Sequence, residues 1–121
     1  MRDTYASVQR MIEYGLPVAL ATDFNPGTCL CGSMEMIITL ACLEMGMTPA
    51  QAICAATING AHALGMAKQV GSIETGKQAD MIIPGLVDYN QLPYYFGRNH
   101  VVMTIKHSEI VMENNQFMDV L

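Results

Sequence analysis

An apolar run that ends at a single carboxylate constrains this chain more than any other feature. Residues 17–21 are all apolar, and Asp23 follows them after one threonine. The run predicts a short buried strand over 16–22, and the Asn-Pro-Gly sequence at 25–27 predicts a sharp turn after it. A carboxylate at the C-terminal end of a buried strand is where barrel and doubly wound enzymes place their chemistry. Two interpretations of Asp23 follow: a catalytic group, or a cap for the turn.

The composition is unusually apolar for a chain of this size. Of its 121 residues, 51% are hydrophobic and 14% are charged, whereas about a quarter of the residues in a typical soluble domain are charged. The longest apolar stretch, residues 34–45, is interrupted by two glutamates and a threonine, so no membrane span is expected. The N-terminus also lacks the apolar segment of a signal peptide. The excess apolarity predicts a missing partner: the chain is a piece of something larger or an obligate oligomer.

Charge and cysteine spacing exclude several kinds of partner. The net charge is -5, and the six lysines and arginines are scattered along the chain, whereas nucleic-acid binding requires a clustered basic face. Cys29 and Cys31 lack the two-residue spacer of a zinc knuckle, and Cys42 and Cys54 fall within predicted helices. We therefore expect four unpaired thiols without a catalytic role, and a cytoplasmic location.

Local signals predict one helix before the apolar run and one helix after it. The first covers residues 3–14, where Asp3 can cap it and a glycine follows its last turn. The second begins after Ser33 and ends at Gly46. Nearly every position of the second helix is apolar, so we expect it to be covered on most sides.

A third helix follows at once, and the sequence then changes to strand-like periodicity. The residues from Thr48 to Gln51 form a capping box with proline at the first helical position, which predicts a helix that continues to Gly65. Beyond residue 70, turn signals and alternating apolar residues predict strands joined by a tight hairpin at His107-Ser108, with a tail that frays. The predicted strands cover 79–83, 100–106 and 109–113, and the tail covers 114–121.

Four segments, in order, resemble the imidazolonepropionase family of the amidohydrolase superfamily. Residues 21–28 resemble the end of barrel strand eight, and the segments 48–61 and 70–80 resemble patterns common to many amidohydrolases. Asp-Phe-Asn-Pro-Gly-Thr at 23–28 and Leu-Pro-Tyr-Tyr-Phe-Gly at 92–97 narrow the resemblance to imidazolonepropionase. The chain departs from the family pattern at Cys29-Leu30-Cys31, Pro84, Tyr95 and His107-Ser108.

The resemblance implies an α/β fold that is only part of a larger enzyme. It implies a C-terminal fragment of a metal-dependent hydrolase TIM barrel, plus part of the small β-sandwich domain. Residues 1–69 would supply the last strand and C-terminal helices of the barrel, and residues 70–121 part of the composite β domain and the C-terminal tail. A complete barrel needs about 200 residues or more.

The resemblance also implies roles for the residues of the turn. In the family, a single Zn or Fe ion is held by a His-x-His pair, another histidine and an aspartate, and by motif match that aspartate is Asp23. Asn25 and Gly27 match residues that contact the substrate or its open product, and Thr28 matches the imidazolone contact. The implied reaction hydrolyses the cyclic amide of 4-imidazolone-5-propanoate to N-formimidoyl-L-glutamate in histidine degradation. A metal-bound water would attack the ring carbonyl, and Asp23 would pass its proton to the departing ring nitrogen.

The chain lacks the remaining ligands of such a site. The three histidines, His62, His100 and His107, have no ligand spacing to Asp23, so we expect them to be structural or solvent-facing. One carboxylate cannot hold a catalytic metal, which needs three or four protein ligands. The isolated chain is therefore predicted to be inactive. Its expected partners are a small-molecule substrate and either the missing N-terminal part of the same enzyme or a second copy in a homo-oligomer.

Two other functions remain open from the sequence. One is a related amidohydrolase, such as a cyclic amidase or a nucleobase deaminase, which substrate-side residues upstream would distinguish. The other is a non-catalytic interaction fragment whose apolar faces pair with another chain.

Overall fold

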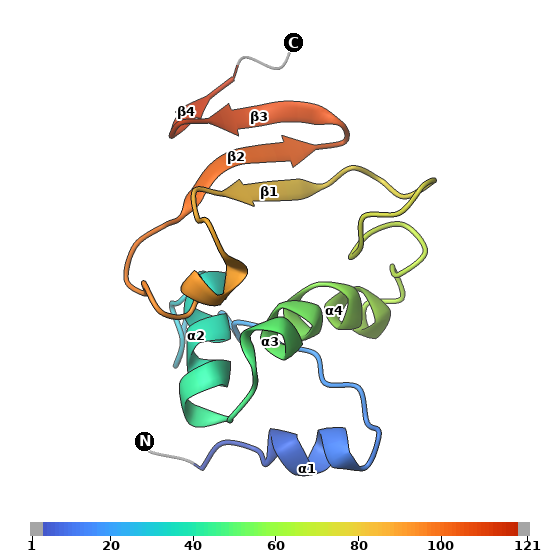
Figure 1. Ribbon diagram of the computed structural model, residues 1–121, viewed down its shortest axis with the longest axis vertical. Coiled ribbons are helices and arrows are strands. Elements are labelled where there is room, and N and C mark those ends of the chain that lie inside the picture. The colour runs from blue at the N-terminus through green and yellow to red at the C-terminus, as the bar shows by residue number, and fades with distance from the viewer. Residues whose placement is uncertain (1–3, 119–121) are drawn as a thin grey trace.

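The computed structural model describes residues 4–118, in which helices gather at one end and a single antiparallel sheet lies at the other (Figure 1). This mixed arrangement agrees with the predicted α/β class. The sheet has four strands in the order β1-β2-β3-β4. In chain order the elements are α1 (Val8–Glu13), α2 (Met34–Glu44), α3 (Pro49–Ala56), α4 (Ile58–Ala63), β1 (Met81–Pro84), η1 (Tyr89–Gln91), β2 (Val101–Lys106), β3 (Glu109–Glu113) and β4 (Gln116–Phe117).

The first helix is shorter than the sequence predicts. It begins at Val8, and Ser7 precedes it without a side-chain capping bond. The proposed cap, Asp3, lies outside the described residues. Only Val8 is buried in this helix, so the preceding residues have no core contact that would extend the helical turn to them.

The predicted strand over 16–22 is wrong as a description of this chain, because the segment forms an irregular loop. A strand requires a ladder of hydrogen bonds to a neighbouring strand. The segment instead has two isolated tethers: the Leu20 amide donates to the Ala55 carbonyl (3.0 Å), and the Asn59 side chain donates to the Val18 carbonyl (2.9 Å). No strand within residues 4–118 lies beside it, and Leu16 remains 56% exposed.

Helix α2 begins as predicted and leaves one face exposed. The Ser33 hydroxyl accepts a hydrogen bond from the Met36 amide (3.3 Å), as expected of an N-cap. Ile38, Thr39 and Ala41 are buried, whereas Leu43 is 66% exposed. The other residues are buried or half-buried except Met36 and Glu44, so the expectation of cover on most sides is met apart from the face that carries Met36, Leu43 and Glu44.

The predicted third helix is divided into α3 and α4. Its capping box is confirmed: the Gln51 amide donates to the Thr48 hydroxyl (3.3 Å), and the Thr48 amide donates to the Gln51 side chain (2.9 Å). The break lies at Thr57, whose φ of -116° and ψ of -92° are not helical. The Thr57 hydroxyl donates to the Ile53 carbonyl (2.7 Å), a backbone-directed bond that commonly bends helices.

Small residues allow the helices to pack closely into one core. Alanines contribute half of its buried members, and α2 contacts α3 directly. Leu92, just after η1, packs against the same core and so links the sheet end to the helices. The buried cluster consists of Val8, Ile38, Ala41, Met47, Ala52 and Ala55.

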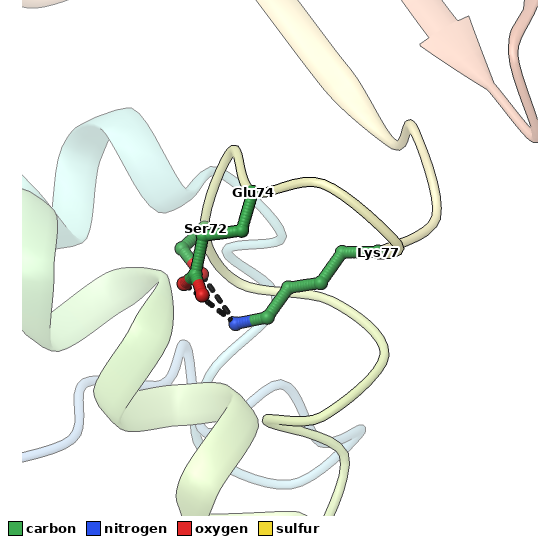
Figure 2. Close-up of polar contacts among 3 residues, drawn as sticks. All are labelled: Ser72, Glu74 and Lys77. Atoms are coloured by element: carbon green, nitrogen blue, oxygen red, sulfur yellow. Dashed lines mark hydrogen bonds and ion pairs between the residues drawn. The ribbon is translucent and has the colours of Figure 1, made fainter.

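The loop between α4 and β1 is held by a small polar cluster (Figure 2). The Ser72 hydroxyl donates to the Glu74 carboxylate, and the Lys77 ammonium donates to both groups, at 2.9 Å from Glu74 Oε1. The hydrogen bond from Ser72, followed by the interactions with Lys77, lowers the pKa of Glu74. These contacts shape the run from Gly71 to Lys77 that resembles the amidohydrolase pattern.

The sheet confirms the three predicted strands and the hairpin, although β1 covers 81–84 where 79–83 was predicted and β2 begins one residue later than predicted, and it adds one strand. β1 ends at Pro84 on the edge of the sheet, where a missing backbone amide is tolerated. His107 and Ser108 have φ of 52° and 70°, as a tight two-residue hairpin requires. The expectation that residues 114–121 fray is wrong for 114–118, because β4 pairs there with β3. Residues 119–121 lie outside the described residues.

Asp80 explains how a His-Ser turn is accommodated. Its carboxylate accepts hydrogen bonds from the His107 amide (2.9 Å) and the Gln78 side chain (2.7 Å), and it pairs with Lys106. The bond from the His107 amide, followed by the bond from Lys106, lowers the pKa of Asp80 from 3.8 to about 2. The Asp80 carboxylate, which precedes β1 in the sequence, therefore stabilises the turn between β2 and β3.

Within residues 4–118, every helix is too short or too polar to cross a membrane.

Candidate functional site

The loop from Asp23 to Cys29 is closed by backbone and side-chain hydrogen bonds. The Asn25 amide donates to the Cys29 carbonyl (2.8 Å), which makes an isolated antiparallel bridge. The Cys29 thiol donates to the Thr22 carbonyl (3.2 Å), and the Phe24 amide donates to the Thr22 hydroxyl (3.3 Å). These hydrogen bonds hold Thr22, which precedes Asp23 and Phe24, and Asn25, which follows them.

The side chain of Asn25 lies at the centre of this loop. Its Oδ1 accepts hydrogen bonds from the amides of Gly27 (2.9 Å) and Thr28 (2.8 Å), and from the Thr28 hydroxyl (3.3 Å). Its Nδ2 donates to the Asp23 carbonyl (2.8 Å) and to Thr28 Oγ1 (3.2 Å). The proposed site residues are therefore brought together by one amide group.

The carboxylate of Asp23 is exposed and accepts no hydrogen bond from residues 4–118. The φ of this residue is 52°, a left-handed conformation that aspartate tolerates better than most residues. The side chain is exposed. No group of residues 4–118 donates a hydrogen bond to its carboxylate, so within the described part of the chain the side chain does not act as a cap.

Gly27 lies close to the side chain of Asn25. A Cβ at this position would lie 3.2 Å from Asn25 Oδ1, tighter than an ordinary van der Waals contact. An alanine at this position would therefore require the Asn25 side chain to shift by a few tenths of an ångström. The absence of a side chain at Gly27 therefore leaves room for the Asn25 amide in the loop.

The described residues do not contain a complete set of metal ligands. Between residues 4 and 118, no group of three or more His, Cys, Asp or Glu side chains could hold an ion. The three histidines are not gathered at Asp23: His62 is exposed on α4, His107 is in the hairpin turn, and His100 is buried with Nε2 2.6 Å from the Tyr95 carbonyl. Within residues 4–118, Asp23 therefore belongs to no such group of possible metal ligands.

A cleft that the sequence did not indicate is lined by none of the residues of this loop. It has a volume of about 670 Å³ and lies between the start of α2 and residues 96–101. The Glu35 carboxylate accepts a hydrogen bond from the His100 amide there (3.1 Å). The only local signal was a glutamate in the first turn of α2, and its partner 65 positions away could not be read from the sequence.

The four cysteines, as predicted, are unpaired.

Comparison with curated proteins gives strong similarity to imidazolonepropionases. The chain is 50% identical over 111 residues to the imidazolonepropionase of Geobacillus kaustophilus, covering 92% of this chain and 26% of that protein. It is 48% identical over 109 residues to the imidazolonepropionase of Alkaliphilus oremlandii, with 90% and 26% covered. The chain thus spans about a quarter of the length of the curated relatives that it matches, which fits the prediction that it corresponds to the C-terminal portion of such an enzyme.

The fold of this chain also occurs as part of larger proteins whose structures have been solved. The chain aligns with the crystal structure of an adenosine deaminase from Xanthomonas campestris with bound zinc, with a TM-score of 0.84 and 23% identity, covering 97% of this chain and 30% of that one. It also aligns with a mutant of atrazine chlorohydrolase from Arthrobacter aurescens complexed with zinc and atraton, with a TM-score of 0.81 and 17% identity, covering 98% and 30%. The model of the amidohydrolase family matches residues 1–111. This chain therefore belongs to the amidohydrolase family.

Proposed function

We propose that this chain is the C-terminal portion of an imidazolonepropionase, a metal-dependent hydrolase that opens the cyclic amide of 4-imidazolone-5-propanoate to N-formimidoyl-L-glutamate in histidine degradation. The observation that carries the proposal is the loop at Asp23–Thr28. Its hydrogen bonds bring together the residues matched to the family motif and leave the Asp23 carboxylate without a donor among residues 4–118. Identities of 42–50% to imidazolonepropionases support the substrate class.

The proposed architecture divides the chain between two parts of the enzyme. Residues 1–69 supply the last strand and C-terminal helices of a TIM barrel, and residues 70–121 supply part of the small β-sandwich domain and the tail. The separation of the helices from the sheet supports this division (Figure 1). The apolar loop over 16–22 supports it too, because the sequence has the composition of a buried strand and would gain ladder partners from neighbouring barrel strands.

In the proposed reaction, Asp23 has two tasks. Its carboxylate offers one ligand to a Zn or Fe ion and accepts the proton of the attacking water, which it then transfers to the departing ring nitrogen. The ion, when bound, supplies a water whose pKa is lowered toward neutrality. Gly27 and Thr28 line the substrate side of the loop.

The partner that completes the site is the N-terminal part of the same enzyme. Residues 4–118 contain no group of three or more His, Cys, Asp or Glu side chains that could hold an ion, so the isolated chain is inactive in this proposal. The exposed apolar side chains near the loop, Leu16, Phe24 and Leu30, support such a partner. The unpaired state of the four cysteines supports a cytoplasmic location. A homo-oligomer would bury apolar surface but would add no His-x-His pair.

A chimeric enzyme tests the proposal. In it, the matched stretch of 111 residues of the Geobacillus kaustophilus imidazolonepropionase is replaced by this chain. We expect the chimera to convert 4-imidazolone-5-propanoate to N-formimidoyl-L-glutamate, and the chain alone with added Zn²⁺ to show only the buffer rate. A chimera built with the corresponding part of a guanine deaminase is the control for non-specific complementation. A folded chimera that contains this chain and lacks turnover would contradict the proposal.

A further inference from the structure

We infer that Asn59, on helix α4, is a positioning residue for the proposed reaction. Its side chain holds the apolar segment 16–22 against the helices and thereby places the carboxylate of Asp23, with which that segment ends. The inference rests on the proposed function and extends it to a residue outside the loop at Asp23. It starts from the contacts that hold the segment in place.

Two long-range hydrogen bonds join the segment to α3 and α4. The Asn59 Nδ2 donates to the Val18 carbonyl (2.9 Å), and the Leu20 amide donates to the Ala55 carbonyl (3.0 Å). Val18 and Leu20 are two residues apart, so their backbone groups fall on the same side of an extended chain. Both side chains are half-buried and pack against the helical core. The polar bonds therefore determine the register of the segment along the helices, which apolar packing alone does not specify.

The break between α3 and α4 makes both partners available. Ala55 lies in the last turn of α3, where backbone carbonyls lack intrahelical partners. A continuous helix would pair the Ala55 carbonyl with the Asn59 amide, four residues on. The break at Thr57 instead leaves that carbonyl to accept from Leu20, while the half-buried Asn59 side chain reaches Val18. The interrupted helix thus serves as a clamp for the segment.

The clamp determines where the Asp23 loop lies relative to the helices. The bonds that close the loop join residues 22–29 to one another, so they fix its shape and leave its position to other contacts. Leu20 is three residues before Asp23, and three residues span at most about 10 Å. A shift of the segment therefore displaces the carboxylate with it. A misplacement of about 1 Å can lower a reaction rate by about a hundredfold.

Amide hydrogen exchange in the 121-residue chain tests the clamp directly. In Asn59→Ala, the Val18 carbonyl loses its donor, and the Leu20 amide should exchange about threefold to tenfold faster. Gln9→Ala is the matched control, because the Gln9 side-chain amide also donates to a distant backbone carbonyl, that of Gly46, which is not part of the segment. Leu20 exchange should not change in Gln9→Ala. An unchanged Leu20 rate in Asn59→Ala, or an equal rise in both variants, would overturn the inference.

Kinetics of the chimeric enzyme connect the clamp to the reaction. A positioning role predicts that Asn59→Ala lowers kcat by about tenfold to a hundredfold and leaves KM within about threefold. Gln9→Ala should leave both parameters within about twofold. Asn59→Asp has nearly the same size as the parent side chain but no N–H donor when ionised. It should lower kcat in the same direction, and it decides the question if Asn59→Ala does not fold.

The positioning role and the proposed function can fail separately. Folded Asn59 variants of an active chimera that lose stability but keep their kcat would show a merely structural role and overturn the inference. A folded chimera that lacks turnover before any mutation would contradict the proposed function instead, and the Leu20 exchange rate would still decide whether Asn59 holds the segment.

Discussion

Gly71→Ala is expected to be among the most destabilising small substitutions in this chain. Gly71 has a φ of 98°, and a Cβ added there would lie 2.6 Å from the Ala61 Cβ and 3.0 Å from the Ile58 Cα. The left-handed conformation costs about 1–2 kcal/mol for a residue with a Cβ. Forcing an extra methyl group against a helix backbone costs about 1–3 kcal/mol more. The sum, about 2–5 kcal/mol, is a large part of the total stability of a typical domain.

Gly76→Ala provides a matched control for the conformational part of this cost. Gly76 has a φ of 89°, and a Cβ there would meet nothing within 4 Å. It should therefore lose only about 1–2 kcal/mol. Urea denaturation followed by circular dichroism measures the free energy of unfolding of both variants. Gly71→Ala should exceed Gly76→Ala by about 1–3 kcal/mol.

A double mutant identifies the contact responsible. Ala61→Gly removes the methyl group nearest to the new Cβ at 2.6 Å, at a helical cost of about 1 kcal/mol. In the Gly71→Ala background, that substitution should cost less than it does alone, because the clash is partly relieved. Equal losses for Gly71→Ala and Gly76→Ala, together with additive effects of Gly71→Ala and Ala61→Gly, would refute the steric reasoning.

Three further predictions concern the helix cap, the hairpin and the proposed catalytic carboxylate. Thr48→Ala should lower the free energy of unfolding by about 1 kcal/mol through loss of the capping box, with the exposed Thr75→Ala as control. Because the pKa of Asp80 is lowered from 3.8 to about 2, its stabilising effect should be complete above pH 3.8 and lost as the pH falls toward 2. The urea midpoints of the parent chain and Asp80→Asn should therefore differ near neutral pH and converge in acid, and a constant difference would contradict this assignment. Asp23→Asn should leave the urea midpoint of the chain unchanged, since its carboxylate accepts no hydrogen bond within residues 4–118, and should reduce turnover of the chimera by about a hundredfold or more.

Features that depend on a few neighbouring residues were predictable from the sequence. The capping box at Thr48 is a local exchange of two hydrogen bonds, so four residues are enough to specify it. Gly46 and Gly65 end their helices with φ of 70° and 71°, a conformation that glycine adopts without a steric penalty. The alternating strand before His107 could be read for the same reason, because period-two burial is a property of the strand itself.

Features that depend on distant partners were not predictable in this way. The segment over 16–22 has the composition of a strand, but no strand within residues 4–118 pairs with it. The residues His107 and Ser108 are not the ones that a tight hairpin turn prefers. The turn is stabilised by Asp80, which precedes β1 and whose carboxylate accepts a hydrogen bond from the His107 amide. The cleft beside His100 depends on Glu35, from a helix far earlier in the chain.

The loop at Asp23 combines both kinds of information. Its sequence by itself determined a turn after an apolar run, the identity of the carboxylate and the resemblance to an amidohydrolase motif, because these rest on residue types and short spacing. Only the tertiary structure showed that the Asn25 side chain bonds to Asp23, Gly27 and Thr28 in the loop. Hydrogen bonds join atoms in particular positions, and the order of residues does not reveal those positions.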